Sequence, residues 1–136
     1  MKLIRMLMMG VLSLLFVSGC GAEKKAKTAE DKVVKGNVKL MTVDPGHFHA
    51  SLVQKFMYDQ VDPVVHVYAP EGAELQEHLK RIESYNTRAE NPTKWQEKVY
   101  TGPDFLEKMI KEKPGNVVVI SGNNAKKTKY IMACIE

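Results

Sequence analysis

Short apolar runs alternate with longer amphipathic stretches along the chain from Val38 onward. A short apolar run bounded by turn residues indicates a strand, and an apolar period of three to four residues indicates a helix. The pattern predicts strands at 38–43, 64–68, about 98–100 and 117–120. The expected helices cover 49–58, 73–85, 104–113 and a last stretch that begins after Asn124.

This regular alternation predicts the fold class. Strands that alternate with helices favour an α/β fold with a parallel sheet, because parallel strands need crossover connections. The run Val117–Ile120 is unbroken and β-branched, which is typical of a strand buried on both faces. A doubly wound nucleotide-binding sheet commonly has about six strands. We therefore expect residues 38–136 to form an incomplete, Rossmann-like parallel sheet of about four strands.

A few single residues lead to separate expectations. Trp95 lies in an irregular loop and is expected to pack into the core rather than to line a crevice. His66 is expected to be a packed polar residue within the second strand, and His78 to lie on a solvated helix face. Cys134 falls in an apolar helical pattern, which favours a small buried hydrophobe over a reactive thiol.

The first 19 residues have the layout of a secretory signal. Lys2 and Arg5 precede an apolar core, and small residues follow it. The end of this segment, Val17-Ser18-Gly19-Cys20, resembles the lipobox of bacterial lipoproteins, in which the cysteine is lipidated and becomes the new amino terminus. The alternative is an ordinary secretory signal with an incidental cysteine. The resemblance implies an exported lipoprotein, anchored to a membrane on the periplasmic or cell-surface side.

The charge balance changes once the signal is removed. The whole chain has a formal net charge of +4, and loss of Lys2 and Arg5 leaves about +2. Such a small excess does not suggest a nucleic-acid partner. Residues 20–37 are polar and lack an apolar period, so we expect a tether between the anchor and the folded domain.

The candidate chemistry lies in the stretch Thr42–Val53, TVDPGHFHASLV. Asp44, Gly46, His47 and His49 fall between the first strand and the first helix, where open α/β sheets bind ligands. Contact with an anion or cofactor is favoured there, because a helix amino terminus attracts negative charge. Two alternatives stay open: one histidine caps the helix, or the His-x-His pair binds a metal as in metal-dependent amidohydrolases.

The glycine pattern gives the dinucleotide interpretation little support by itself. If Gly46 is the third glycine of the fingerprint G-x-G-x-x-G, the other two positions hold Met41 and Val43. Those glycines normally let the backbone turn tightly and approach the pyrophosphate.

Several blocks of the sequence together resemble the amino-terminal half of the Gfo/Idh/MocA family, sugar and polyol oxidoreductases that use NAD or NADP. The blocks cover Val38 to Glu136; they are DPGHFHASLVQK, HVYAPEG, HLKRIESYNTRAENP, EKVYTGPDFLEKM and KPGNVVVISGNN. They are most similar to a subgroup of oxidoreductases from Bacteroidetes-type bacteria. The resemblance implies a nicotinamide dinucleotide as partner and a sugar-like substrate in a full-length form.

The resemblance also implies site residues. Gly46, His49 and Ala50 match the first loop of the family, and Ser121, Gly122 and Asn123 match the residues beside the nicotinamide ribose. The adenosine ribose usually meets an acidic residue after the second strand. Glu71 is the nearest substitute, which leaves the choice between NAD and NADP open.

The part of the family that carries catalysis is expected to be absent from this sequence. In the family, the next strand leads to a Glu-Lys-Pro motif, and a β-sheet domain then supplies the substrate site. Neither follows Asn123 here, so we name no catalytic residue and expect a cofactor-binding half. A non-catalytic module that binds phosphate or sugar is the main alternative, and a metal-dependent hydrolase is the third. The unpaired edge of a half sheet also predicts self-association, and so a possible homo-oligomer.

Overall fold

The computed structural model describes residues 35–135. The expectations for the signal segment, for lipidation of Cys20 and for most of the tether lie outside these residues. The elements in chain order are β1 (Leu40–Val43), α1 (His49–Leu52), β2 (Val64–Tyr68), α2 (Ala73–Thr87), β3 (Gln96–Tyr100), α3 (Phe105–Glu112), β4 (Val117–Ile120) and α4 (Asn124–Ile135). Within this range, no helix is long and apolar enough to cross a membrane.

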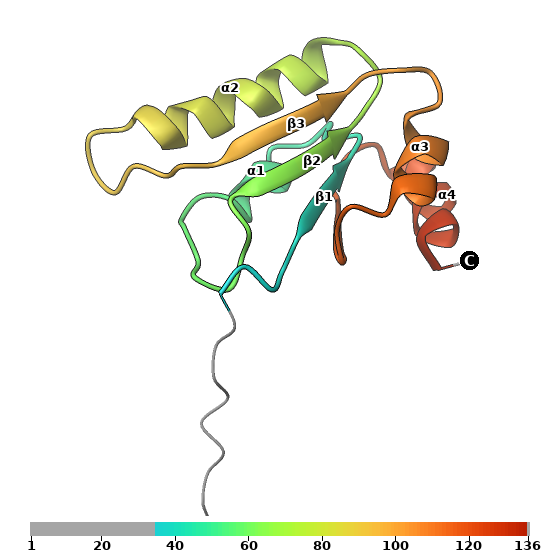
Figure 1. Cartoon of the computed structure of the whole chain (residues 1–136). Helices are drawn as coiled ribbons and strands as arrows, with labels where there is room; N and C mark the ends of the chain where they lie inside the picture. The colour runs from blue at the N-terminus through green and yellow to red at the C-terminus, as the bar shows by residue number, and fades with distance from the viewer. Residues whose placement is uncertain (1–34, 136) are drawn as a thin grey trace, which may run out of the picture. The chain divides into compact units, whose positions relative to one another are not determined.

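The four strands form one parallel sheet in the order β3-β2-β1-β4. Val43 at the end of β1 pairs with Tyr68 of β2 and with Ile120 of β4, so these strands end level with one another. The sheet lies between α2 on one side and α3 and α4 on the other (Figure 1). The predicted α/β, Rossmann-like parallel sheet with alternating helices is thereby confirmed.

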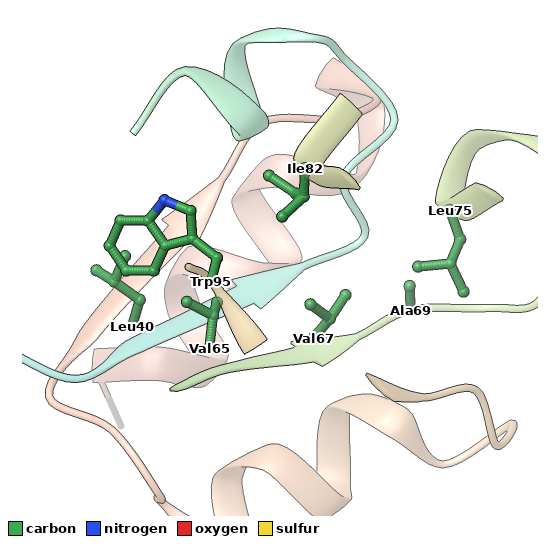
Figure 2. Close-up of a cluster of buried hydrophobic side chains, with 7 residues drawn as sticks. All are labelled: Leu40, Val65, Val67, Ala69, Leu75, Ile82 and Trp95. Carbon is green, nitrogen blue, oxygen red and sulfur yellow. The ribbon is translucent and has the colours of Figure 1, made fainter. Parts of the chain in front are cut away.

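Each face of the sheet has its own apolar cluster, because side chains along a strand alternate between faces. The cluster under α2 contains Leu40, Val65, Val67, Ala69, Leu75, Ile82 and Trp95. Figure 2 shows the Trp95 indole beside Leu40 and Val65, with Ile82 above the strand. Trp95 is only 4% exposed, which confirms its expected place in the core. The opposite cluster contains Met41, Val43, Tyr68, Leu106, Met109 and Tyr130.

The first helix is much shorter than the predicted 49–58. It ends at Leu52, and turns and irregular backbone follow as far as Tyr58. The carbonyl oxygen of Gln54 accepts a hydrogen bond from Nε1 of Trp95 at 2.6 Å, and the Gln54 amide nitrogen Nε2 bonds to Glu97. These long-range bonds fix the chain in a turn at Gln54, and the sequence pattern does not reveal them.

Strand β4 lies at the edge of the sheet. The prediction that it is buried on both faces is wrong. Its only neighbour in the described sheet is β1. Val117 is 41% exposed, and the other three residues are partly exposed. The β-branched run therefore reports a parallel strand but not its position in the sheet.

Two single-residue expectations are wrong. His78 is 3% exposed because it lies on the buried stripe of α2, three residues after Leu75 and four before Ile82. Cys134 is exposed on α4 and is not a buried hydrophobe. His66 agrees with its prediction, since it is partly buried and stacks on Tyr68 with a centroid separation of 6.5 Å.

The letters Glu-Lys-Pro do occur in the chain, at residues 112–114, but they close a helix. Lys113 has a φ of 43° and ends α3, and its backbone N–H bonds to the carbonyl of Met109. A lysine in this left-handed position terminates the helix before β4 begins. The tripeptide therefore lies outside the carboxyl edge where ligands bind in such sheets.

Candidate functional site

The loops after β1 and β4 meet at the carboxyl edge of the sheet. The backbone N–H of His47 donates to the carbonyl of Ser121 at 3.0 Å. A Cβ atom at Gly122 would collide with the carbonyl oxygen of Asp44, so this close approach requires glycine. β1 and β4 are neighbours whose following helices cover opposite faces, which is the switch point where open sheets bind ligands. The structure thus brings together two of the predicted groups of site residues.

Asp44 joins the first loop to the last helix. The residue is 3% exposed, and Oδ2 accepts hydrogen bonds from the Tyr130 hydroxyl at 2.6 Å and from Nζ of Lys126 at 3.0 Å. Burial and the hydrogen bond to Asp44 raise the pKa of the Tyr130 hydroxyl above its ordinary value. The φ of Asp44 is 43°, a left-handed conformation that aspartate tolerates better than most residues. Its carboxylate is engaged within the chain and holds the turn in place.

Gly46 lies against a carboxylate that the sequence analysis missed. A Cβ atom at Gly46 would lie 2.9 Å from Oε2 of Glu74, in the first turn of α2. A hollow of about 260 Å³ lies between this loop and α2. Its lining consists of Pro45, Gly46, His47, Phe48, Ala73, Glu74, Glu77, His78 and Arg81. Glu71 is exposed and does not line it, so Glu74 and Glu77 are the carboxylates that border the hollow.

His78 gives the hollow an uncharged wall. Burial lowers the pKa of His78 to about 4, and the charge of Arg81 acts in the same direction. Its Nε2 atom is buried and has no hydrogen-bond partner in the described structure. The imidazole is therefore neutral at physiological pH. Its position in the stripe between Leu75 and Ile82 is the sequence signal that identifies it as buried.

His47, Phe48 and His49 form an exposed aromatic cluster at the rim. Their ring centroids are 4.2 to 4.6 Å apart. Nδ1 of His47 accepts a long hydrogen bond, 3.4 Å, from the backbone N–H of His49 at the start of α1. This bond supports the capping alternative for His47, because it gives an acceptor to a backbone N–H in the first turn of α1.

The first helix offers little to an anion. It has only four residues, and the backbone N–H groups of His49, Ala50 and Ser51 already have acceptors within the chain. These three N–H groups are therefore not free to bind an anion, and the expected anion or cofactor contact at this loop stays a prediction. For a metal, no group of three histidine, cysteine, aspartate or glutamate side chains is suitably placed among residues 35–135.

The loop after β4 is well placed but partly engaged. Ser121 and Gly122 are half-buried beside the first loop, and Asn123 is exposed. The Asn123 Oδ1 accepts a hydrogen bond from the backbone N–H of Ala125 at 2.9 Å, so this side chain caps α4. Its amide nitrogen has no hydrogen-bond partner among the described residues, so it can still donate to a ligand.

The site matches a dinucleotide in part. The loop contact through Gly122 and the Glu74 carboxylate beside the hollow suit a nucleoside ribose, whose hydroxyls donate to carboxylates. The pyrophosphate end lacks two fingerprint glycines and finds no unpaired amides on α1. The geometry therefore fits the ribose part better than the pyrophosphate part.

The chain is similar to a solved structure of another protein. No model of a protein family matches the chain, and no curated protein matches it either. The chain is similar to the crystal structure of a putative oxidoreductase from Parabacteroides merdae, with 61% sequence identity and a TM-score of 0.74. The match covers 76% of this chain and 24% of that protein, so this chain spans about a quarter of its length.

Proposed function

We propose that this chain supplies the dinucleotide-binding part of an NAD-dependent oxidoreductase of the Gfo/Idh/MocA type that acts on a sugar or polyol. The observation that carries the proposal is the closure of the β1 and β4 loops on each other at the switch point of the sheet, next to the Glu74 carboxylate. The similarity to a putative oxidoreductase from Parabacteroides merdae, 61% identical over the matched part, supports an oxidoreductase in general.

Glu74 is the residue we propose as acceptor for the adenosine ribose. Its carboxylate lies against Gly46, whereas the side chain of Glu71 is exposed outside the hollow. A carboxylate accepts hydrogen bonds from the two ribose hydroxyls of NAD and repels the 2′-phosphate of NADP. Glu77, which also borders the hollow, adds a second negative charge with the same effect. These charges favour NAD over NADP.

The bound nicotinamide would supply the hydride chemistry, and the residues of this chain would bind and orient it. Gly122 lets the two loops approach, and Asp44 keeps the first loop in position through Tyr130 and Lys126. The proton-transferring residue and the sugar site belong in this proposal to a further part of a longer protein. We also propose that the chain is exported and anchored by a lipid on Cys20. Labelling with palmitate tests the lipidation, because wild type should take up the label and Cys20→Ser should not.

The test is binding of NAD⁺ and NADP⁺ to the purified chain, measured by isothermal titration and by saturation-transfer NMR. We expect NAD⁺ to bind more tightly than NADP⁺. Glu74→Gln should weaken NAD⁺ binding about tenfold to a hundredfold, because a hydrogen bond to a charged group contributes about 1.5–3 kcal/mol. Glu71→Gln is the matched control and should leave the affinity unchanged. No binding of either dinucleotide at millimolar concentration would refute the proposal.

A second candidate, a non-catalytic sugar-binding module, is favoured by one observation. Glu74 and Glu77 both border the hollow, and two carboxylates there suit the hydroxyl groups of a sugar. This candidate predicts binding of monosaccharides with the same loss in Glu74→Gln and no response to NAD⁺. The same titrations with glucose and inositol in place of the dinucleotide separate the two candidates.

A further inference from the structure

A second surface lies at the amino edge of the sheet, away from the candidate site. The backbone N–H of Gly36 donates to the carbonyl of Asp59 at 3.0 Å, and Val38 bridges to Val61. The first described residues therefore lie beside the turn that leads into β2. In Figure 1 this corner is at the bottom, whereas the strand arrows point away from it, toward the carboxyl edge.

Three consecutive large side chains are exposed at this corner. Phe56, Met57 and Tyr58 have exposed fractions of 47%, 40% and 42%. They lie in the irregular backbone that follows the end of α1. Exposed apolar groups that adjoin one another mark contact surfaces more often than isolated ones do.

Basic residues surround these three side chains. The guanidinium of Arg88 lies 5.2 Å from the centre of the Phe56 ring, and Nζ of Lys55 lies 5.8 Å from it. Lys35 and Lys94 line a hollow of about 540 Å³ together with Met57 and Tyr58. Asp59 is the one acidic residue in that lining. We call Phe56, Met57, Tyr58, Lys35, Lys55, Arg88 and Lys94 the amino-edge surface.

This combination suits one partner chemistry. Aromatic and apolar side chains enter the boundary between lipid headgroups and acyl chains, and lysine and arginine attract anionic headgroups. The stems of the basic side chains also contribute apolar surface there. A protein partner with an acidic, apolar face would suit the charges as well, but the position of the surface in the chain favours the bilayer.

That position follows from the sequence. Residues 21–34 connect Lys35 to Cys20, the proposed lipid site. A chain of that length spans at most about 50 Å. The corner where the chain enters the fold is thus confined near any membrane that holds Cys20. A weak surface contact becomes effective under such confinement, because the second contact is intramolecular.

We propose that the amino-edge surface docks on an anionic lipid bilayer and turns the carboxyl edge of the sheet toward the aqueous side. The lipid on Cys20 holds the chain at the membrane, and Phe56, Met57 and Tyr58 fix its orientation. A substrate or further domain then reaches the loops after β1 and β4 without obstruction by the bilayer.

The experiment measures contact with lipid at defined positions. The full chain is reconstituted into vesicles of phosphatidylethanolamine with about one third phosphatidylglycerol, in which the acyl chains carry bromine as a fluorescence quencher. Tyr58→Trp reports the amino-edge surface, and Ile131→Trp, at a 48% exposed position on α4, is the matched control. The buried Trp95 is common to both proteins, and its signal is subtracted.

We expect strong quenching and a blue-shifted emission at position 58 and neither at position 131. Reversal of two charges, Lys35→Glu with Lys94→Glu, should lower the ratio of docked to undocked molecules tenfold or more, because each basic residue near the surface contributes about a factor of five. High salt should act in the same direction.

Equal quenching at positions 58 and 131, or a chain that does not stay with the vesicles, would overturn the proposal. Quenching at 58 that persists in vesicles of phosphatidylcholine alone and in the charge-reversal variant would overturn the role of anionic lipid. Protection of Tyr58→Trp only in the presence of a second protein would assign the surface to a protein partner instead.

Discussion

The region around Trp95 and the region around β4 and α4 differ in how completely the described chain covers them. At the interface between α2 and the sheet, Trp95, Val65 and Ile82 are 4% exposed or less. In the other region, Val117, Ile131, Met132 and Ile135 are 41% to 71% exposed. The first region is a finished core, and the second leaves apolar surface for something else to cover.

The largest difference is expected when one large apolar side chain is removed from each region. Trp95→Ala should lower the free energy of unfolding by about 3–5 kcal/mol, because it leaves a cavity and an unpaired Gln54 carbonyl. Ile131→Ala should change it by less than about 0.5 kcal/mol, since the side chain is half exposed. Urea unfolding followed by far-UV circular dichroism measures both, and equal losses would abolish the contrast.

The covered region also contains a buried carboxyl group. Burial raises the pKa of Glu97 to about 7, although the hydrogen bond from Gln54 opposes the shift. Its Oε2 atom is buried and has no hydrogen-bond partner among the described residues. In the unfolded chain the group titrates near pH 4.5. The folded state therefore holds the proton more tightly, and stability falls as the pH rises from about 4.5 to 7.

Glu97→Gln should remove this loss. The variant is expected to be more stable than wild type by about 1–2 kcal/mol at pH 8, a value reduced from the full shift because the side chain is partly solvated. Near pH 4.5 the two proteins should unfold at the same urea concentration. Glu83→Gln, at an exposed position that lines a hollow together with Glu97, is the control; it keeps Glu97 and should therefore lose stability between about pH 4.5 and 7 as wild type does.

The same contrast explains what the sequence could predict. The alternation of strands and helices follows from local period, so the pattern predicts β2 at its observed bounds. The core position of Trp95 follows from its residue type, since a lone aromatic side chain in a loop more often packs into a fold than binds a ligand. The length of α1 depends on the bond between Gln54 and Trp95, which joins residues far apart in the chain. Likewise, an apolar run marks β4 as a strand but does not say whether a neighbour covers both of its edges.

The site was predictable to a similar depth. The position of Asp44 and Gly46 after the first strand follows from general rules for α/β sheets. That Asp44 is held by Tyr130 and Lys126 depends on residues more than eighty positions away. Glu74 was missed because its contact with Gly46 depends on how α2 lies over the loop, and no local pattern encodes that.

The smallest effect on stability is expected at the exposed face of α4, although its effect on association should be clear. An unpaired edge strand beside apolar side chains invites self-association, so we expect the purified chain to associate reversibly at micromolar concentration. Ile131→Ser combined with Met132→Ser should weaken this association about tenfold while leaving urea unfolding nearly unchanged. Each replacement removes an apolar side chain of which about half is already in water, so the folded monomer loses little.

Sedimentation velocity measures the association. Phe56→Ser combined with Met57→Ser, at the amino edge, is the matched control and should associate like wild type. A monodisperse wild-type monomer would contradict the expectation and would mean that the described edge of β4 is protected by its own twist and by the neighbouring helix.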